Sequence, residues 1–202
     1  MAKQTINLVL ATSVLALGIS TAASAGDIAS ASMLSSTCNG CHGANGNSVG
    51  PASPNIAQME KVVFVEAMQA FKSGDTYSTI MGRIAKGYTD EEIKRMAGHF
   101  AAQKLVPAKQ EFDVAAVKKG ARLHNKYCEK CHEDGGKPVD GENAEYHLLA
   151  GQWTPYLVNT IADFRAGRRE MPRKMKKKLD KLIEKEGEKG LAAINAFYAS
   201  QQ

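Results

Sequence analysis

All four cysteines of this 202-residue chain lie in two copies of one pentapeptide, Cys38-Asn39-Gly40-Cys41-His42 and Cys128-Glu129-Lys130-Cys131-His132. The pattern Cys-x-x-Cys-His is the attachment signal for c-type haem. Two thiols three positions apart lie on one side of a helical turn, where each can form a thioether with one vinyl group of the haem. The histidine that follows can then ligate the iron. The motifs therefore predict two covalently bound haem c groups, held by Cys38, Cys41, His42, Cys128, Cys131 and His132.

Other uses of cysteine explain the pattern less well. Two disulfides or two metal sites would each account for a Cys-x-x-Cys pair, but neither accounts for the histidine after both pairs. Four cysteines are also too few for a disulfide-dense scaffold of this length. The 44% hydrophobic and 23% charged residues are typical of a globular protein and exclude a disordered tail, a collagen and a polytopic membrane protein.

The N-terminal residues have the pattern of a secretory signal. Lys3 is the only charged residue before Asp27, and an apolar stretch runs from Leu8 to Ile19. Ala23-Ser24-Ala25 then supplies a small-x-small cleavage site. The alternative is a membrane anchor, but the apolar run is shorter than the ~20 residues that a spanning helix needs. We expect a signal peptide over residues 1–25 and export of the mature protein to the periplasm.

The two motifs belong to an internal repeat, because they are 90 positions apart and further segments match at similar spacing. Phe71-Lys72-Ser73-Gly74 corresponds to Phe164-Arg165-Ala166-Gly167, and residues 99–103 correspond to residues 197–201. Pro107 is a plausible stop between the two units. The sequence therefore predicts two tandem domains, over residues 26–107 and 108–202.

The predicted elements are helices, and no segment has a convincing strand pattern. Thr89-Asp90-Glu91-Glu92 is a capping box, and a stripe at i, i+3, i+4 and i+7 follows it. Similar stripes precede the second motif and end the chain. We expect an all-α fold of two class I cytochrome c domains, in each of which the first and last helices cross. The stripes comprise Ile93, Met96, Ala97 and Phe100; Val114, Val117 and Ala121; and Leu191, Ile194 and Phe197 or Tyr198.

Each iron needs a sixth ligand or an open position, and a methionine thioether suits electron transfer because it raises the reduction potential. In the first unit Met68 and Met96 lie in apolar stretches, where core packing explains them. Met81 lies just before the last helix, in a segment that can fold over the haem. We expect Met81 to be the ligand, with Met59 as the alternative.

The second unit offers Met171 and Met175. Counted from the histidine, Met171 matches Met81, but the intervening loops differ in composition. Counted from the nearer phenylalanine, Met81 lies 10 residues after Phe71 and Met175 lies 11 after Phe164, whereas Met171 lies only 7 after it. We expect Met175 to be the ligand, and Met171 stays the alternative.

The other ring nitrogen of each motif histidine needs an acceptor that orients the ring. The Pro54-Asn55-Ile56 segment begins 12 residues after His42 and resembles the proline element of class I cytochromes c. His147-Leu148-Leu149 takes this place in the second unit, where a backbone carbonyl can serve equally well. The ring of His147 is a less favoured alternative. His99 and His124 lie in expected helices, and we assign them to packing or to the surface.

The formal net charge of +5 is concentrated in the second unit. Residues 26–107 are neutral overall, whereas residues 108–202 carry a net charge of +4. Three interpretations of this charge stay open: a solvated helix face, a balance for haem propionates, and a docking site for an acidic redox partner. A nucleic-acid partner is not expected. The excess lies in a basic stretch for which we expect only Glu170 as counter-charge: Arg165, Arg168, Arg169, Arg173, Lys174, Lys176, Lys177 and Lys178.

Nearly the whole expected mature chain resembles the dihaem cytochrome subunit of flavocytochrome c sulfide dehydrogenase, a relative of the cytochrome c4 group. Short elements such as Ile-Ala-Gln and Leu-Ala-Gly-Gln also occur in cytochromes c4, but the longer strings favour the sulfide dehydrogenase subunit. The most specific stretches are SVGPASP at residues 48–54, IMGRIAKGY at residues 80–88, KYCEKCH at residues 126–132 and LAGQWTPYL at residues 149–157.

This resemblance implies a heterodimer with a separate flavoprotein subunit, whose covalently bound FAD oxidises sulfide. The cytochrome subunit takes electrons from the flavin and passes them one at a time to a soluble cytochrome c. Our chain has no Gly-x-Gly-x-x-Gly and no cysteine outside the two motifs. We therefore expect electron relay between the His42/Met81 and His132/Met175 sites, and no sulfide chemistry on this chain alone.

A second hypothesis is a free-standing carrier that serves a terminal oxidase, as cytochromes c4 do. A dihaem peroxidase is a third, but it needs an open iron and usually a longer chain. A subunit should expose an apolar docking patch, whereas a free carrier should not. Candidates for such a patch are Trp153, Tyr156 and the Val62-Val63-Phe64 run, although packing in the core or the haem pocket is the favoured interpretation of each.

Overall fold

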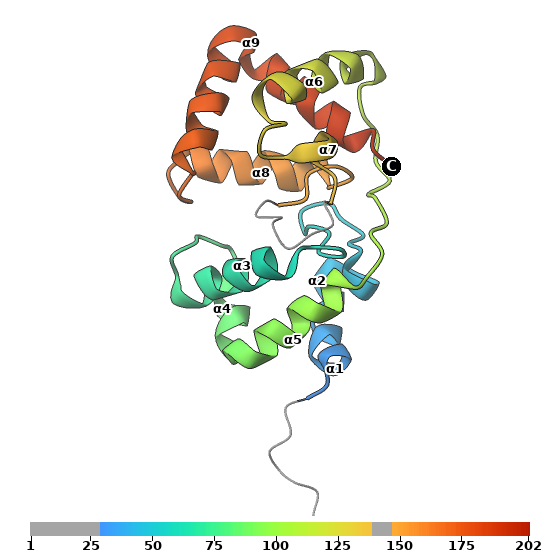
Figure 1. The fold of residues 1–202 in the computed structure, drawn as a ribbon, viewed down its shortest axis with the longest axis vertical. Helices are drawn as coiled ribbons and strands as arrows, with labels where there is room; N and C mark the ends of the chain where they lie inside the picture. Colours follow the sequence, from blue (N-terminus) through green and yellow to red (C-terminus); the bar gives the residue numbers. More distant parts are fainter. Residues whose placement is uncertain (1–28, 139–146) are drawn as a thin grey trace, which may run out of the picture.

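The computed structural model describes residues 29–138 and 147–202, and this part of the chain contains helices but no strand. The expected signal peptide lies outside the described residues. Figure 1 shows two groups of helices, one above the other, joined on one side by an extended connection. The first group comprises α1 (Ala31–Ser36), α2 (Asn39–His42), α3 (Lys61–Ser73), α4 (Met81–Ile84) and α5 (Asp90–Ala101). The second comprises α6 (Val114–Tyr127), α7 (Glu133–Gly136), α8 (Thr154–Arg165) and α9 (Arg173–Ala199).

The core of the first unit forms where α5 packs against α1 and α3. The capping box at the start of α5 is confirmed, since the amide of Glu92 donates to Thr89 Oγ1 (3.2 Å) and the amide of Thr89 donates to Glu92 Oε2 (2.7 Å). The stripe predicted after it is fully buried from Ile93 to Phe100. Met68 and Met96 are buried as well, as expected for core methionines.

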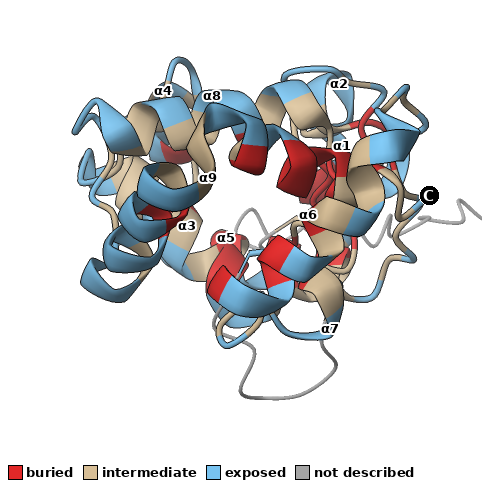
Figure 2. Ribbon diagram, turned by 90° about the horizontal axis from the view of Figure 1, so that it is seen from above, coloured by how far each residue is buried: buried red, intermediate tan, exposed pale blue. Residues whose placement is uncertain are grey.

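The second unit is built around the crossing of α6 and α9, so the first and last helices of each unit pack together as predicted. Its apolar cluster includes Leu123, Leu182, Ile194 and Tyr198. α9 is interrupted at Gly187, whose positive φ of 65° breaks the helical path. Figure 2 shows that buried residues gather on the inner sides of the helices in both units.

The two units repeat the same backbone hydrogen bonds in the loop after the motif. The carbonyl of Gly46 accepts two successive amides, and the carbonyl of Gly136 accepts two in the same way. The next residue has a positive φ in each unit, at Gln58 (57°) and at Gly151 (71°), and its amide donates to the last helix. This pattern aligns Ile56, Ala57, Gln58 and Phe100 with Leu149, Ala150, Gly151 and Tyr198. The repeat inferred from the sequence thus extends to the path of the loop.

The two units meet through loops that carry buried polar groups. Asn55 and Gln152 are 0% and 1% exposed and bond to each other across the contact. Trp153 lies over Gly50, where a Cβ would come within 2.5 Å of the indole ring, and its Nε1 donates to the carbonyl of Ser48 (3.1 Å). Trp153 was one candidate for an exposed docking patch. It is instead part of the contact between the two units.

The segments that repeat in sequence also touch in space. The guanidinium of Arg169 donates to the carbonyl of Tyr77 (3.1 Å) and lies 5.8 Å from the ring centre of Phe71. Arg168 lies over the ring of Tyr77 at 5.6 Å. The loop after α8 therefore docks on the first unit at α3 and the loop that follows it, which is its own counterpart.

The close crossing of α6 and α9 predicts a position that tolerates no side chain. A Cβ at Gly120 would overlap the carbonyl oxygen of Ala193, which belongs to the backbone of α9. Gly120→Ala should lower the free energy of unfolding of the holoprotein by roughly 1–3 kcal/mol, because the helices must move apart. Denaturant unfolding measures this loss. Gly98→Ala in α5 is the control, because a Cβ at Gly98 would meet nothing within 4 Å and alanine favours helix; equal effects of the two changes would contradict the assignment.

Candidate haem sites

Both pentapeptides fold into a single turn of helix that places the second cysteine and the histidine on one loop. The amide of His42 donates to the carbonyl of Cys38 (2.9 Å), and the amide of His132 donates to the carbonyl of Cys128 (3.0 Å). The first turn is α2, whereas the second follows directly on the C-terminal end of α6. The two sites thus have the same local backbone but different supports.

The four thiols are free, with no disulfide among them. Burial raises the pKa of Cys38, and burial raises the pKa of Cys128 to about 11 despite a hydrogen bond with Tyr198. A thiol-exchange site needs the opposite, a lowered pKa that favours the thiolate. The environment of these cysteines therefore argues against a redox dithiol and agrees with an attachment role.

Each motif histidine is oriented by a backbone carbonyl in the following loop. His42 Nδ1 lies 2.9 Å from the carbonyl oxygen of Pro54, as predicted. Burial lowers the pKa of His42. Burial also lowers the pKa of His132 to about 4, and a hydrogen bond with the backbone of His147 opposes this second shift in part. Burial thus favours the neutral form of both rings, and at His42 the engaged Nδ1 leaves the lone pair of Nε2 for a metal.

The methionines considered as sixth ligands differ in whether they pack against the apolar clusters that the motif cysteines contact. Met81 begins α4 and, like Cys38, packs against the first core cluster. In the second unit Met171 packs against the cluster that Cys128 also contacts, while Met175 is half-buried in the first turn of α9. Met59, the alternative in the first unit, also borders the first cluster.

A buried polar network lies beneath the second motif and was not predicted from the sequence. His124, 0% exposed in α6, bonds through Nδ1 to the hydroxyl of Tyr198 (2.8 Å) and through Nε2 to Glu129 Oε2 (2.5 Å). Glu129 also accepts the amides of Asp134 (3.1 Å) and Gly135 (3.2 Å). His124 is therefore a packing residue, as expected, but one that fixes the loop of the second motif. The only sequence signal was its distance of four residues from Cys128, one helical turn.

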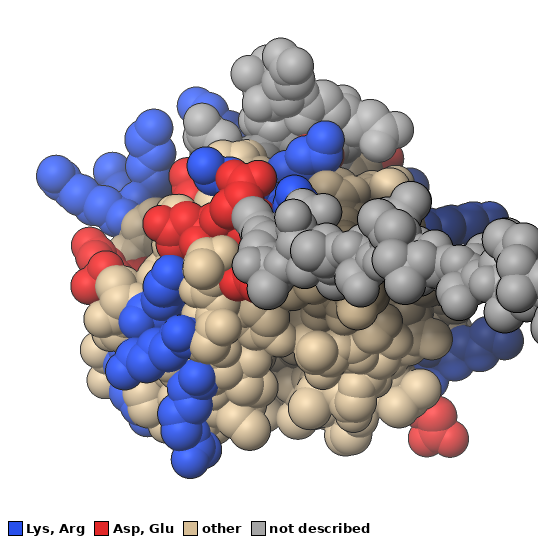
Figure 3. Space-filling view, turned by 90° about the horizontal axis from the view of Figure 1, so that it is seen from below, with Lys and Arg blue, Asp and Glu red and all other residues tan. Residues whose placement is uncertain are grey.

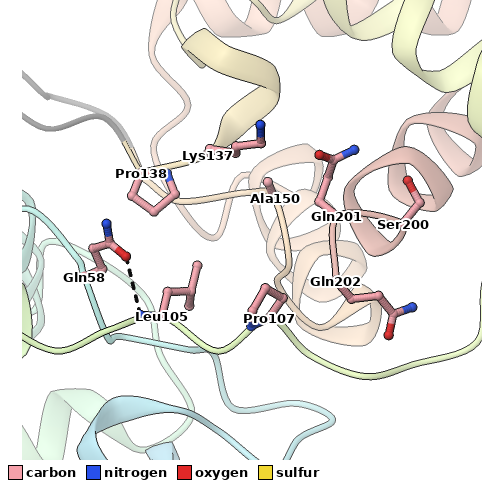
Figure 4. A pocket seen from close by; sticks show the side chains of 9 residues that line it. All are labelled: Gln58, Leu105, Pro107, Lys137, Pro138, Ala150, Ser200, Gln201 and Gln202. Atoms are coloured by element: carbon pink, nitrogen blue, oxygen red, sulfur yellow. Dashed lines mark hydrogen bonds between the residues drawn. The ribbon is translucent and has the colours of Figure 1, made fainter.

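Two cavities among the described residues are lined by no motif residue, although the second, of about 630 Å³, borders Met171 beside Phe164 and Arg169. A cavity of about 520 Å³ is bordered by the connection between the units and the C-terminus, and Figure 4 shows Gln58, Leu105, Pro107 and Gln202 around it. It has no cysteine, histidine or methionine in its lining. The described residues also contain no group of three or more His, Cys, Asp or Glu side chains that could hold a metal ion. Direct metal binding, one of the alternatives for the cysteine pairs, thus finds no support in this part of the chain.

The chemistry of the two sites fits a covalently attached haem. Each combines two free thiols, a histidine that burial favours in its neutral form, and a methionine thioether beside an apolar cluster. Such a cluster excludes water from a bound macrocycle, and the thiols can close two thioether bonds to it. In addition, no helix among the described residues is long and apolar enough to cross a membrane.

Comparison with known proteins finds similarity to cytochromes. Residues 115–182 match the family of cytochrome c oxidase, cbb3-type, subunit III. Cytochrome c4 from Pseudomonas aeruginosa is 27% identical over 199 residues, which cover 95% of this chain and 98% of the relative. The crystal structure of reduced cytochrome c4 from Pseudomonas stutzeri has a TM-score of 0.68 at 23% identity, over 85% of this chain and 98% of that one.

The chain is a cytochrome c4-like dihaem cytochrome. Its fold is two class I cytochrome c domains, and it carries two covalently bound haem c groups, as the two motifs predicted. A shorter match is closer in sequence: the cytochrome subunit of sulfide dehydrogenase from Chlorobaculum tepidum is 46% identical over 68 residues, covering 34% of this chain and 61% of the relative.

The expectation that Glu170 alone balances the basic stretch of this cytochrome is wrong. Arg165 pairs with Glu188 (2.8 Å), and Arg168 and Arg169 both approach Asp163 (2.7 and 3.7 Å). Lys176 pairs with Asp180 (2.7 Å). Within the basic stretch, the unpaired positive charge therefore lies in the first turns of α9. There the described residues offer no ion-pair partner to Arg173, Lys174, Lys177 or Lys178. Figure 3, viewed from the side of the first unit, shows basic and acidic side chains beside a broad area that has neither.

The network around Glu129 predicts a pH-dependent contribution to the stability of the cytochrome. Burial acts to raise the pKa of Glu129, but hydrogen bonds from His124 and from the amides of Gly135 and Asp134 outweigh it and leave the pKa below its usual value. Such a carboxylate stabilises the fold above the usual pKa of about 4.3, and the stabilisation is lost as the pH falls through the lowered value.

Glu129→Gln should therefore cost about 1 kcal/mol at pH 7, a modest figure because the carboxylate is partly exposed. The difference from the wild type should shrink below pH ~4.3. Denaturant unfolding at several pH values measures it. Glu133→Gln, an exposed charge change in the same loop, is the matched control; a pH-independent loss at residue 129 would contradict the role of its charge.

Proposed function

We propose that this cytochrome is the electron-transfer subunit of a flavocytochrome c sulfide dehydrogenase in the periplasm. In this role it takes electrons from the FAD of a separate flavoprotein subunit and passes them to a soluble cytochrome c. The observation that carries the proposal is the 46% identity to a sulfide dehydrogenase cytochrome subunit over 68 residues, well above the 27% identity to a full-length cytochrome c4. The chain is then one half of an enzyme and performs no substrate chemistry itself.

The chemistry of the proposed donor suits two one-electron sites. A reduced flavin carries two electrons, and bound haem supplies an iron that accepts one electron at a time. The chain has two attachment motifs and no dinucleotide-binding glycine pattern. It can therefore store both electrons from one flavin turnover while leaving the flavin site to its partner.

We assign the residues of each site as follows. Cys38 and Cys41 attach the first haem, which His42 and Met81 ligate. Cys128 and Cys131 attach the second, which His132 and Met175 ligate. Pro54 and the backbone of His147 orient the two histidines, and the apolar clusters beneath the motifs exclude water, which favours a high potential.

The surface supports docking at the first unit. Tyr77 and Ile80 are 42% and 47% exposed in the loop that leads to Met81, and this unit has no net charge. Apolar side chains beside a redox site can exclude water from an interface between proteins. The positive first turns of α9 instead suit a transient, acidic partner such as a soluble cytochrome, because complementary charge raises the association rate.

A free-standing carrier that serves a terminal oxidase is the second candidate. The observation that favours it is the cytochrome c4 likeness, which covers 95% of this chain, whereas the sulfide dehydrogenase likeness covers 34%. The two candidates use the same haem sites and differ in whether a flavoprotein is bound.

Purification of the native protein distinguishes the two candidates. We expect the cytochrome to copurify with a flavin-containing subunit, and the complex to reduce added cytochrome c when sulfide is supplied. The cytochrome separated from that subunit should not respond to sulfide. A lone dihaem protein that is indifferent to sulfide would overturn the first proposal and leave the carrier.

The methionine assignments predict different spectra for two neighbouring variants. In the oxidised protein, Met175→Leu should remove the contribution of one site to the far-red absorption of methionine-ligated haem, and it should lower one reduction potential. Met171→Leu should leave this absorption unchanged, because that side chain then serves only packing. The reverse result would move the ligand to Met171.

A further inference from the structure

The amide of Gln152 in the second unit bonds to the backbone of Asn55 in the first unit at two points. Gln152 Oε1 accepts the amide of Asn55 (2.9 Å), and Gln152 Nε2 donates to the carbonyl of Asn55 (2.7 Å). The Asn55 side chain completes the contact by donating to the carbonyl of Gly151 (3.2 Å) and accepting the amide of Ser48 (2.7 Å). Gln152 is thereby fixed in one orientation inside the contact.

One peptide group connects this contact to the first haem site. The peptide bond between Pro54 and Asn55 donates its N–H to Gln152 Oε1, and its carbonyl oxygen lies 2.9 Å from His42 Nδ1. Hydrogen bonds that follow one another through a peptide group polarise each other and strengthen. The bond to Gln152 therefore makes the Pro54 carbonyl a better acceptor for the ring of His42.

A stronger acceptor at Nδ1 makes an imidazole a more basic ligand. A more basic ligand stabilises the ferric over the ferrous state, so the potential of the site falls. The Gln152 amide should thus act on the iron of the first site without touching its ligands.

The second site lacks the same arrangement. The matching backbone hydrogen bonds align Asn55 with Leu148 and Gln152 with Met59. Met59 packs against the first core cluster, and its thioether has no N–H and is only a weak acceptor. The contact between the units therefore acts on the two histidines unequally.

We propose that Gln152 is a positioning residue for the first haem site, which it tunes across the contact between the units through the Pro54–Asn55 peptide. Its effect is to lower the reduction potential of the first haem and to leave that of the second unchanged. The inference rests on the assignment of His42 as an iron ligand and is independent of whether the electrons come from sulfide.

The test is a redox titration of the purified holoprotein with Gln152→Met. This change keeps the approximate volume of the side chain. It also gives position 152 the same residue type as Met59, which occupies the matching position of the first unit. We expect one of the two potentials to shift upward, with the methionine-ligated absorption retained at both sites. Gln103→Met is the matched control, because Gln103 donates to the carbonyl of His99 (2.9 Å) within the first unit and does not contact the Pro54 loop; neither potential should move.

The sign of the shift separates tuning from damage. Loosening of the contact would admit water to the haem, which stabilises the ferric state and shifts the potential downward. A downward shift, no shift, or equal shifts at both sites would overturn the proposal. Gln152→Glu retains an acceptor oxygen for the amide of Asn55, so it should reverse the upward shift.

A measurement on the unmodified protein covers the case in which the Gln152 variants do not fold. In NMR spectra of the reduced protein, the Nδ1 proton of His42 should resonate further downfield than that of His132, because its hydrogen bond is the stronger. Equal shifts, or a larger shift at His132, would overturn the proposal. If the spectra showed that His42 is not one of the two ligand histidines, the ligand assignment would be refuted instead. A failed sulfide assay would affect neither the ligand assignment nor the role of Gln152.

Discussion

The hydrogen bond between each motif histidine and a backbone carbonyl is the constraint on which both haem sites depend. At His42 this bond engages Nδ1 and leaves Nε2 for the iron, and in the second unit His132 bonds to the backbone of His147. The carbonyl must therefore be held at a fixed place in the loop that follows the motif. In each unit that loop is tied back by two amides to one glycine carbonyl, at Gly46 and Gly136, and by a further amide to the last helix. The crossing of the first and last helices thus positions the ring through the loop.

The same loops form the contact between the units, which couples the geometry of one site to the other. Buried polar groups would be costly here without partners, and the Asn55–Gln152 pair satisfies them reciprocally. Around this pair, Trp153 lies over Gly50, and Arg169 lies over Phe71. Because repeated segments meet one another, the contact resembles that of a symmetric dimer whose halves have been joined in one chain.

Local signals in the sequence were sufficient to predict several helices and the backbone acceptor of His42. The capping box of Thr89, the stripe from Ile93 to Phe100 and the acceptor at Pro54 each depend on residues a few positions apart. The Asn55–Gln152 pair joins residues 97 positions apart, and no periodicity reveals such a contact. In the basic stretch the same reason applies to Arg165, whose partner lies 23 residues away in α9, whereas Asp163 and Asp180 are near in sequence and lie just outside the stretch. The network of His124 with Tyr198 joins residues 74 positions apart, so local sequence patterns could not predict it either.

The two motifs share their cysteines and their histidine, so any difference between the sites must come from the residues between and around these. The first motif is preceded by Thr37, whose hydroxyl bonds to that of Tyr88 (2.6 Å), and it presents neutral residues between its cysteines. The second has a charged carboxylate, Glu129, anchored on the buried His124. A difference in potential between two sites decides which of the irons holds an electron at equilibrium. Duplication of one domain gives two equal sites. This fold makes them unequal through divergence of these polar surroundings, while the attachment chemistry stays the same.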